Sequence, residues 1–597
     1  MNIRKHLKQF SFFAAFAGLC LLGCSSPVSS SSSSSSGSGS GSGGSGSSST
    51  SYARISQSVD TGKLVSSADA VSSVSFGNEI TVNLGGVSWT AGSNSGTASS
   101  DAAEMTDSIT IKNTSGHIVI DASASTAATK ITFTGSISSG ELEIKGSTSF
   151  AIQLCLSGAS ISSSSYPCIN VTTATKTFLV LEGSSSLTDG RTYGNAYSSG
   201  GSSTKGTLYS KGAILVSGSG SLSVTEGYAH GIYSKDYIRI FGGSITVNNA
   251  GLSCIRSQNG FVMDGGTLTL KGTTSHSTRK NNNSRGIIVE GDESAPGEGF
   301  IYITGGTVNI NTTGKAISAK WDIDEDAETS STSDDPNPVV YITGGTFTIR
   351  TSDSVVDSDR SSTITYTKYN GETESEKESC SPEGIEGKNG VIIAGGTFDI
   401  QTTDDALNAS YSTYGYVNIS GGTLYLYSKQ GDAIDSNGDI NISGGTVVTV
   451  APTGSEDGFD CDGSLNFTGG LAAGISGSSH SYASGGSSTQ KVFVLGSSYA
   501  GSAGKTMAIK DSSGNPVFVF TIPSVASGYS IITLSSPKIG TGSYSIWSGV
   551  SASGGSASNG LYTSLPSVSG GSTTGTITTS SGSAVYMLGA SSGMGGF

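Results

Sequence analysis

Apolar and polar residues alternate along most of this chain in short runs, and many of these runs meet at a pair of glycines. The phrase apolar-x-Gly-Gly has its first glycine at positions 242, 265, 305, 344, 395, 421, 444 and 469. The intervals are 23, 40, 39, 51, 26, 23 and 25 residues, and the long ones hold polar insertions at about 273–285, 322–337 and 358–382. A basic period of 23 to 26 residues is typical of a protein built from stacked repeats.

Within one repeat the apolar residues follow the period of a β-strand, as Ile440 and Ile442 do. Two or three short strands per repeat, with Gly, Asn and Asp at the corners, predict one turn of a parallel β-helix. Successive turns would stack about 4.8 Å apart. The glycine pair would form a corner that a Cβ atom would obstruct. We therefore predict an all-β solenoid over residues 80–487. A β-propeller is the alternative, but its period would be nearer 40 to 50 residues.

The N-terminus has the features of a targeting segment. Arg4, Lys5 and Lys8 precede an apolar run that ends in Leu-Leu-Gly-Cys24, and this order resembles the lipobox of bacterial lipoproteins. We expect a signal peptide over residues 1–24 and a lipid on Cys24, so that the protein is exported and anchored to the bacterial membrane or cell surface. The alternative is an ordinary secretory signal with a chance cysteine. A Ser/Gly tether would follow over 25–51 and a lead-in segment over 52–79.

The glycine period stops near residue 488. Residues 488–550 predict a small antiparallel β unit that covers the open end of the solenoid, where unpaired strand edges would otherwise invite strand addition. Residues 551–597 are rich in Gly, Ser and Thr, and this composition predicts a mobile tail.

Composition excludes some partners. The formal net charge is −14, which argues against nucleic acid because phosphate binding needs a basic surface. Cys155 and Cys168 are candidates for a disulfide in an exported protein, or for buried small apolar residues. The spacing of the cysteines matches no zinc site.

A second repeated feature lies nine residues before most glycine pairs and consists of a small residue and an apolar residue between two variable positions. In the last four repeats those variable positions and their neighbours are acidic. The candidate ligands are Glu383, Glu386, Asp404, Asp405, Asn408, Asp432, Asp435, Asp457, Asp460 and Asp462. Stacking would bring these carboxylates within a few ångströms, where like charges repel unless a cation intervenes. Oxygen ligands without His or paired Cys favour Ca²⁺; the alternative is a solvated acidic face without an ion.

Earlier repeats carry basic residues near the corresponding places instead. These residues are His230, Arg256, Arg285 and Lys315. The acidity therefore belongs to one end of the predicted solenoid and is not a property of the repeat itself.

At these residues the chain resembles the carbohydrate-binding-domain proteins of cellulolytic clostridia. The resemblance extends from about residue 80 to about 550, through LVLEGSSSLTDG, GIEGKNGVIIAGGTFDIQTTDDALNA, GDAIDSNGDINISGG and DGFDCDG. It implies a right-handed parallel β-helix similar to family 9 pectate lyases, with bound calcium and with polygalacturonate or cellulose as ligand. It also implies calcium ligation by Asp404, Asp405, Asp432, Asp435, Asp457 and Asp460. The lyase pattern Asp-Asp-x-x-Asp ends here in Asn408, so that the site has one charge fewer.

Three functions follow as hypotheses. The first is a monomeric, calcium-dependent protein that binds acidic plant polysaccharide, with Tyr414, Tyr425, Tyr427 and Lys388 touching the sugar. The second is a polysaccharide lyase that uses Lys388 or Lys429 as its base. The third is a surface adhesin or spacer without catalytic activity. The residues leave open that the tyrosines only cap strand edges and that Lys388 only pairs with Glu386.

Overall fold

The computed structural model describes residues 65–164, 166–190, 206–225, 229–272, 284–291, 299–321, 338–352, 364–367, 373–376, 381–411, 415–478 and 487–590. All of them belong to one compact unit, residues 50–591. Within these residues the chain is nearly all β, and helix is confined to α2 (Ser497–Ala500) and to the short 3-10 turns η2 (Ser67–Asp69), η3 (Val71–Ser73) and η6 (Ser524–Ala526). No helix among them is long and apolar enough to span a membrane.

Most strands belong to three columns in which each strand pairs in parallel with the strand of the next repeat. The first column contains β6 (His117–Asp121), β9 (Glu141–Lys145), β12 (Ile169–Val171), β15 (Gly206–Ser210), β18 (His230–Ser234), β21 (Ser253–Ser257), β24 (Arg285–Gly291), β27 (Ile317–Trp321), β32 (Ile385–Gly387), β35 (Leu407–Ala409), β38 (Ile434–Ser436) and β40 (Asp460–Cys461). Two strands that pair antiparallel, β4 (Ala103–Thr106) and β5 (Ile109–Thr114), precede it.

The second and third columns belong to one larger sheet. The second contains β1 (Asn78–Asn83), β7 (Thr129–Thr134), β10 (Ile152–Ser157), β13 (Thr177–Glu182), β16 (Ile214–Gly218), β19 (Tyr237–Ile240), β22 (Gly260–Met263), β25 (Phe300–Ile303), β28 (Val339–Ile342), β33 (Gly390–Ile393) and β36 (Tyr416–Ile419). The third contains β8 (Ser136–Ile137), β11 (Ser160–Ser162), β14 (Ser184–Thr188), β17 (Ser221–Thr225), β20 (Ser244–Ala250), β23 (Thr267–Gly272), β26 (Thr307–Thr312), β29 (Thr346–Thr351), β34 (Thr397–Thr402) and β37 (Thr423–Ser428). The long strands β39 (Asp439–Ala451) and β41 (Leu465–Ser476) continue both columns.

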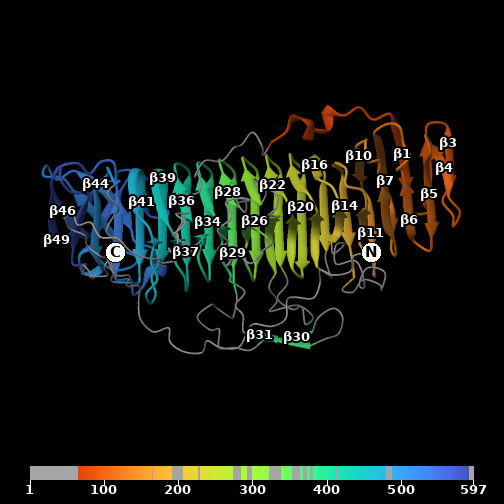
Figure 1. The fold of residues 1–597 in the computed structure, drawn as a ribbon. Coiled ribbons are helices and arrows are strands. Elements are labelled where there is room, and N and C mark those ends of the chain that lie inside the picture. The colour runs from red at the N-terminus through yellow and green to blue at the C-terminus, as the bar shows by residue number, and fades with distance from the viewer. Residues whose placement is uncertain are drawn as a thin grey trace, which may run out of the picture. The chain divides into compact units, whose positions relative to one another are not determined.

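One repeat of the sequence therefore supplies one strand to each column, in the order second, third, first, as in β33, β34 and β35. Figure 1 shows the strands of the larger sheet side by side in chain order, for example β28, β36, β39 and β41. Apolar residues of successive repeats lie in register and are buried, such as Ile385, Leu407 and Ile434 of the first column. The all-β class and the long parallel sheets agree with the prediction.

The glycine pairs mark the turn between the second and third columns. In every pair from Gly242–Gly243 to Gly469–Gly470 the second glycine has a positive φ, which side chains disfavour. The first glycine lies against the previous repeat. A Cβ atom on Gly421 would lie 2.3 Å from the carbonyl oxygen of Ala394, and one on Gly444 would lie 2.1 Å from that of Ser420. Both glycines are therefore needed, for different reasons.

Antiparallel strands stand at both ends of the columns. At the start, β1 forms a hairpin with β2 (Ser88–Ala91), and β2 forms a second hairpin with β3 (Asn94–Thr97). After β41, β42 (Val492–Gly496) and β45 (Ile531–Ser535) extend the larger sheet. A separate antiparallel sheet follows, made of β43 (Thr506–Lys510), β44 (Pro516–Thr521), β46 (Gly542–Ser553), β47 (Ser556–Ser558), β48 (Leu561–Ser564) and β49 (Ser567–Thr579). One more hairpin joins β30 (Ile364–Thr367) to β31 (Thr373–Glu376).

The expectation of a mobile tail after residue 551 is wrong for the described part of that segment. β49 pairs with β46 over most of its length, and β50 (Val585–Leu588) pairs in parallel with β42. Threonine and serine dominate β49, and threonine favours strands because its branched side chain packs well on a pleated surface. Ile577 is buried in the core beneath this sheet, so the few apolar residues of the segment suffice to fix it.

The described cysteines are buried thiols. Cys155, Cys168, Cys254 and Cys461 are all free, so the structure supports the apolar role and not the disulfide between Cys155 and Cys168.

A segment before β1, residues 66–76 and here called the strap, packs on the outer face of the second column. Val71, Val74 and Phe76 contact the buried Phe178 and Leu215. The carboxylate of Asp69 is 2% exposed and accepts hydrogen bonds from Lys176 Nζ at 2.7 Å, Tyr237 Oη at 2.6 Å and an Arg239 guanidinium nitrogen at 3.2 Å. One buried acidic residue thus joins the strap to the repeats of β13 and β19, which lie on either side of the β16 repeat.

The substitution Asp69→Asn is expected to release the strap without unfolding the sheets. Losing a hydrogen bond to a charged group costs about 1.5–3 kcal/mol, which corresponds to a rise of about tenfold or more in local opening. Hydrogen exchange of the amides of residues 66–76 measures this opening directly. Unchanged exchange in the variant would show that the apolar contacts alone hold the strap.

Candidate metal centre

The last four strands of the first column align the acidic residues in two rows. Glu386, Asn408, Asp435 and Asp460 lie in register on β32, β35, β38 and β40, and they form the row here called the 386 row. The residues three positions earlier form the 383 row, which contains Glu383, Asp405, Asp432 and Asp457. Backbone hydrogen bonds of 2.8, 3.1 and 3.0 Å connect this second row from one repeat to the next. The spacing in the sequence thus places the rows correctly.

The two rows reach the same surface because the backbone bends between them. In a regular strand, side chains alternate, so Asp432 and Ile434 would share a face. Instead Ala433 and Ile434 are both fully buried, whereas Asp432 and Asp435 are half-buried. The buried pair anchors each repeat in the core and leaves a carboxylate on either side of it.

Three carboxylates meet at the C-terminal end of the rows. Asp432, Asp435 and Asp460 each offer an oxygen atom, and these atoms lie within 4.8 Å of one another. Burial and the neighbouring Asp460 raise the pKa of Asp432 to about 9, and burial with Asp460 and Asp462 raises that of Asp435 to about 7. Within the described residues, neither Asp432 nor Asp435 forms an ion pair with a Lys, Arg or His side chain. This set of hard oxygen ligands suits Ca²⁺.

Asp405 has a different role in the same surface. One of its carboxylate oxygens accepts the Asp432 backbone N–H at 2.8 Å, and the other accepts Asn408 Nδ2 at 3.1 Å. Burial, together with the charges of Asp404 and Asp435, raises its pKa well above the usual range. The side-chain oxygen of Asn408 is buried and has no hydrogen-bond partner within the described residues. Asp405 and Asn408 thus support the rows, and Asn408 offers one further oxygen.

The remaining acidic candidates are spread around this surface. The side chain of Asp404 lies beside Gly431, where a Cβ atom would approach its Oδ1 to 2.8 Å. Asp457 is 3% exposed, and its backbone N–H donates to Asp432 Oδ1. Asp462 is exposed. The structure does not bring these three into the group of Asp432, Asp435 and Asp460.

The first acidic pair of the two rows, Glu383 and Glu386, is neutralised within the protein. Lys315 Nζ lies 3.2 Å from Glu383 Oε2 and 2.7 Å from Glu386 Oε1. Ser318 and Ser410 donate to Glu386 at 2.6 and 3.1 Å. Burial favours the neutral form of Glu386, but Lys315 outweighs it and lowers the pKa of Glu386 to about 2. Burial raises the pKa of Glu383 well above its usual range. Lys315 thus balances the single charge of Glu386, a pairing that the sequence did not indicate.

The candidate bases and sugar contacts lie apart from one another. Lys388 is 8% exposed and its charge acts on Glu386, whereas Lys429 is exposed at the corner before Asp432. Tyr425 and Tyr427 lie on β37 of the third column and pack against the core of the C-terminal sheets, so the structure does not place them beside the acidic rows. Tyr414 and the lipidation site Cys24 lie outside the described residues.

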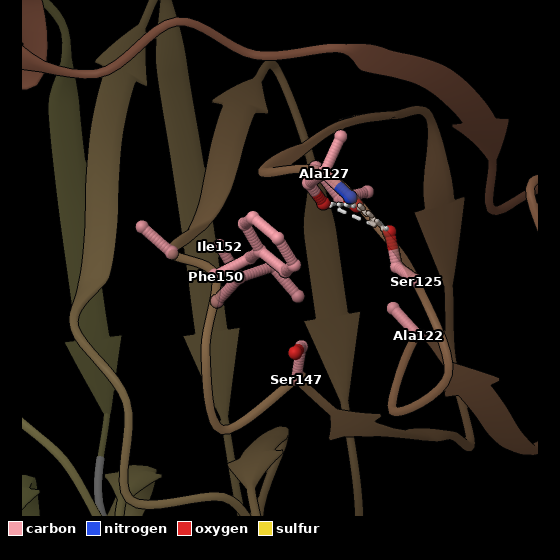
Figure 2. A pocket seen from close by; sticks show the side chains of 8 residues that line it. Ala122, Ser125, Ala127, Ser147, Phe150 and Ile152 are labelled. Atoms are coloured by element: carbon pink, nitrogen blue, oxygen red, sulfur yellow. Dashed lines mark hydrogen bonds between the residues drawn. The ribbon is translucent and has the colours of Figure 1, made fainter.

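Two hollows elsewhere offer no comparable chemistry. Figure 2 shows Phe150 and Ile152 facing Ser125 and Ala127 across a recess that has no room for a water molecule. Ser125 is already engaged there, because its hydroxyl donates to the Ala127 carbonyl at 2.8 Å. A hollow of about 390 Å³ on β1, β2 and β3 is lined by Thr81, Asn83, Trp89 and neighbouring hydroxyl side chains, without a charged group.

Without a bound cation the protein is expected to lose stability as the pH rises from about 4 to 9. The pKa of Asp432 and of Asp435 is higher in the folded state than in the unfolded chain. The unfolded state therefore binds fewer protons over this range, and the unfolding free energy falls with increasing pH. Thermal melts at several pH values in chelator measure the fall, and added Ca²⁺ should suppress it. A melting temperature that rises from pH 5 to 9 in chelator would contradict this electrostatic picture.

A match to a family model supports a carbohydrate-binding protein. A family model described as "Carbohydrate-binding domain-containing protein" matches residues 123–414, just under half of the chain. The group of Asp432, Asp435 and Asp460 follows the matched stretch. No curated protein matches the sequence. Among solved structures, the polysaccharide lyase-like protein from C. thermocellum, studied as a gadolinium derivative, is 19% identical, and the alignment covers 46% of this chain and 92% of that one with a TM-score of 0.34.

Proposed function

We propose that this protein binds plant cell-wall polysaccharide through Ca²⁺ held at the acidic rows, with the acidic polymer polygalacturonate (pectin) as the first candidate and the neutral polymer cellulose as the second. The observation that carries the proposal is the group of Asp432, Asp435 and Asp460, with oxygens within 4.8 Å and no basic partner for Asp432 or Asp435 within the described residues. The match to a carbohydrate-binding family model indicates the class of ligand.

Ca²⁺ fits these residues because it takes six to eight oxygen ligands in flexible geometry. Asp432, Asp435 and Asp460 would hold it, and their three carboxylates would leave coordination positions for carboxylates of the polymer. A bound divalent cation would keep all three residues ionised at neutral pH, against the raised pKa of Asp432 and Asp435. Binding would therefore release protons.

The same proposal includes the architecture and the location. We infer a right-handed parallel β-helix, which the three parallel columns and the constant strand order support and which would display the rows along one face. The signal peptide and lipidated Cys24 would hold a monomer on the outside of a bacterial membrane. No nucleic acid partner is expected.

Binding is favoured over lyase activity by the position of Lys388. A catalytic base needs access to the sugar, but Lys388 is 8% exposed and its charge already stabilises ionised Glu386. The position of Lys388 thus argues against it as the base, whereas Lys429 is exposed three residues before Asp432 and is the base that the alternative lyase would use.

Binding of polygalacturonate to the full chain, with Ca²⁺ or with chelator, tests this function. We expect retention on the immobilised polymer that chelator abolishes, without the ultraviolet absorbance of unsaturated products. Unsaturated products would establish a lyase instead. Retention on no glycan would leave the protein as an adhesin or spacer.

A further inference from the structure

The outer face of the second column carries one continuous row of side chains in register. Phe178 pairs with Leu215, and the row then runs through Arg239 and Val262 to Tyr302 and Tyr341. It continues through Ile392, Asn418, Asn441 and Asn466. After Arg239, no residue of this row is charged. This row therefore contrasts with the acidic rows of the first column; the carboxylate of Asp439 lies on the same face as the row, two residues before Asn441 on β39.

The beginning of the row shows what this face accepts. The strap lies across it, with Phe76 packed edge-on against Phe178 at 6.3 Å between ring centroids and with Asp69 bound by Arg239. The strap crosses successive repeats without adding a strand to the sheet. This face can therefore hold a segment of chain through contacts made by its own outward side chains.

Beyond the strap, the row presents a pair of aromatic rings. Tyr302 and Tyr341 stack with centroids 5.2 Å apart and an angle of 22° between the rings. Both are partly exposed, and their hydroxyls make no hydrogen bond in the described part of the chain. Tyrosine with one apolar face and an available hydroxyl is common at binding surfaces, since it buries area at low entropic cost.

An amide ladder follows the tyrosines on the same row. Asn441 Nδ2 donates to Asn418 Oδ1 at 2.9 Å, and Asn466 Nδ2 donates to Asn441 Oδ1 at 2.9 Å. These bonds fix the orientation of the amides from one repeat to the next. Asn418 and Asn441 are partly exposed, so the row offers oriented polar groups next to aromatic surface.

We propose that Tyr302, Tyr341, Asn418 and Asn441 form a second binding surface, which takes an extended, uncharged polysaccharide without calcium. The absence of charge on the row favours a neutral partner, the outward edges and hydroxyls of the stacked rings can contact the C–H and hydroxyl groups of sugars, and the amides match their hydroxyls. The proposal rests on the proposed function only in that the ligand is a carbohydrate, since the acidic rows belong to a different sheet.

Affinity electrophoresis of the full chain in gels containing soluble xylan or soluble mixed-linkage β-glucan tests this surface. The double variant Tyr302→Ala with Tyr341→Ala is expected to bind the neutral polymer about tenfold more weakly, as for the loss of aromatic anchors. Tyr302→Phe with Tyr341→Phe should retain most of the binding. Tyr166→Ala, which removes an exposed tyrosine elsewhere, is the matched control and should bind normally.

The test separates the two surfaces. The double alanine variant should keep its chelator-sensitive binding of polygalacturonate, and Asp435→Asn with Asp460→Asn should keep its binding of the neutral polymer. Normal neutral binding by the alanine variant, loss of both ligands in it, or no neutral binding by the wild type would each overturn the inference. If only polygalacturonate binding fails in the wild type, the proposed function is wrong and this surface stands.

Discussion

Ca²⁺ at one hundred times its dissociation constant is expected to raise the unfolding free energy by about 2.7 kcal/mol, because it binds the folded state alone. The cation would offset two of the three negative charges that folding brings within 4.8 Å. In the unfolded chain Asp432 and Asp435 lie far from Asp460 in space, so no comparable site exists there. The protein should consequently melt at a markedly lower temperature in chelator than in millimolar Ca²⁺.

Differential scanning calorimetry of wild type and of Asp435→Asn with Asp460→Asn measures this effect. The variant should melt at the same temperature with and without Ca²⁺, because two of three carboxylates are gone. Asp399→Asn is a matched control, since its carboxylate is partly exposed on the third column and pairs with Arg350. If Ca²⁺ stabilised the variant as much as the wild type, the ion would bind elsewhere.

The substitution Lys315→Met is expected to lower the unfolding free energy by about 3–5 kcal/mol, as for other buried ion pairs that lose one partner. Lys315 contacts Glu383 and Glu386, whose side chains are 6% and 4% exposed. Methionine keeps much of the length of the side chain but leaves the ionised Glu386 buried without its cation. The loss of stability should shrink in acid, where Glu386 becomes protonated in the wild type as well as in the variant.

Urea unfolding of wild type and Lys315→Met gives the size of this loss. The triple variant that also carries Glu383→Gln and Glu386→Gln should recover much of the stability, because no buried charge then lacks a partner. A loss below about 1 kcal/mol in the single variant is typical of exposed pairs, and it would show that the pair is solvated.

The repeat and the alignment of the rows could be predicted because both depend on spacing alone. A glycine pair with a basic period of 23 to 26 residues fixes the corner of each repeat. A constant offset of nine residues from that pair fixes the positions of the acidic residues. Parallel pairing then brings Asn408, Asp435 and Asp460 into line. Even Asn408, shifted by a four-residue insertion before its glycine pair, lies in register, because the insertion falls outside the strands.

The sequence did not reveal interactions between residues far apart in the chain. Lys315 meets Glu383 across a long insertion, and its neutralising role depends on distances that no periodicity expresses. The ion pair between Asp69 of the strap and Arg239 likewise joins residues far apart in the chain, and no periodicity in the sequence expresses it. The sequence does contain a signal for the stacked Tyr302 and Tyr341, since the phrase YITGGT occurs twice. Only the strand register shows that the two tyrosines are neighbours on the outer face.

The most direct test of the central claim is a calorimetric titration of Ca²⁺ into the metal-free protein, with and without polygalacturonate, for wild type and for Asp435→Asn with Asp460→Asn. We predict that the wild type binds Ca²⁺, that the polymer tightens this binding, and that the double variant shows neither effect. Equal binding of Ca²⁺ by the wild type and the variant, or no effect of the polymer on the wild type, would contradict the claim that the acidic rows hold the cation that grips the polysaccharide.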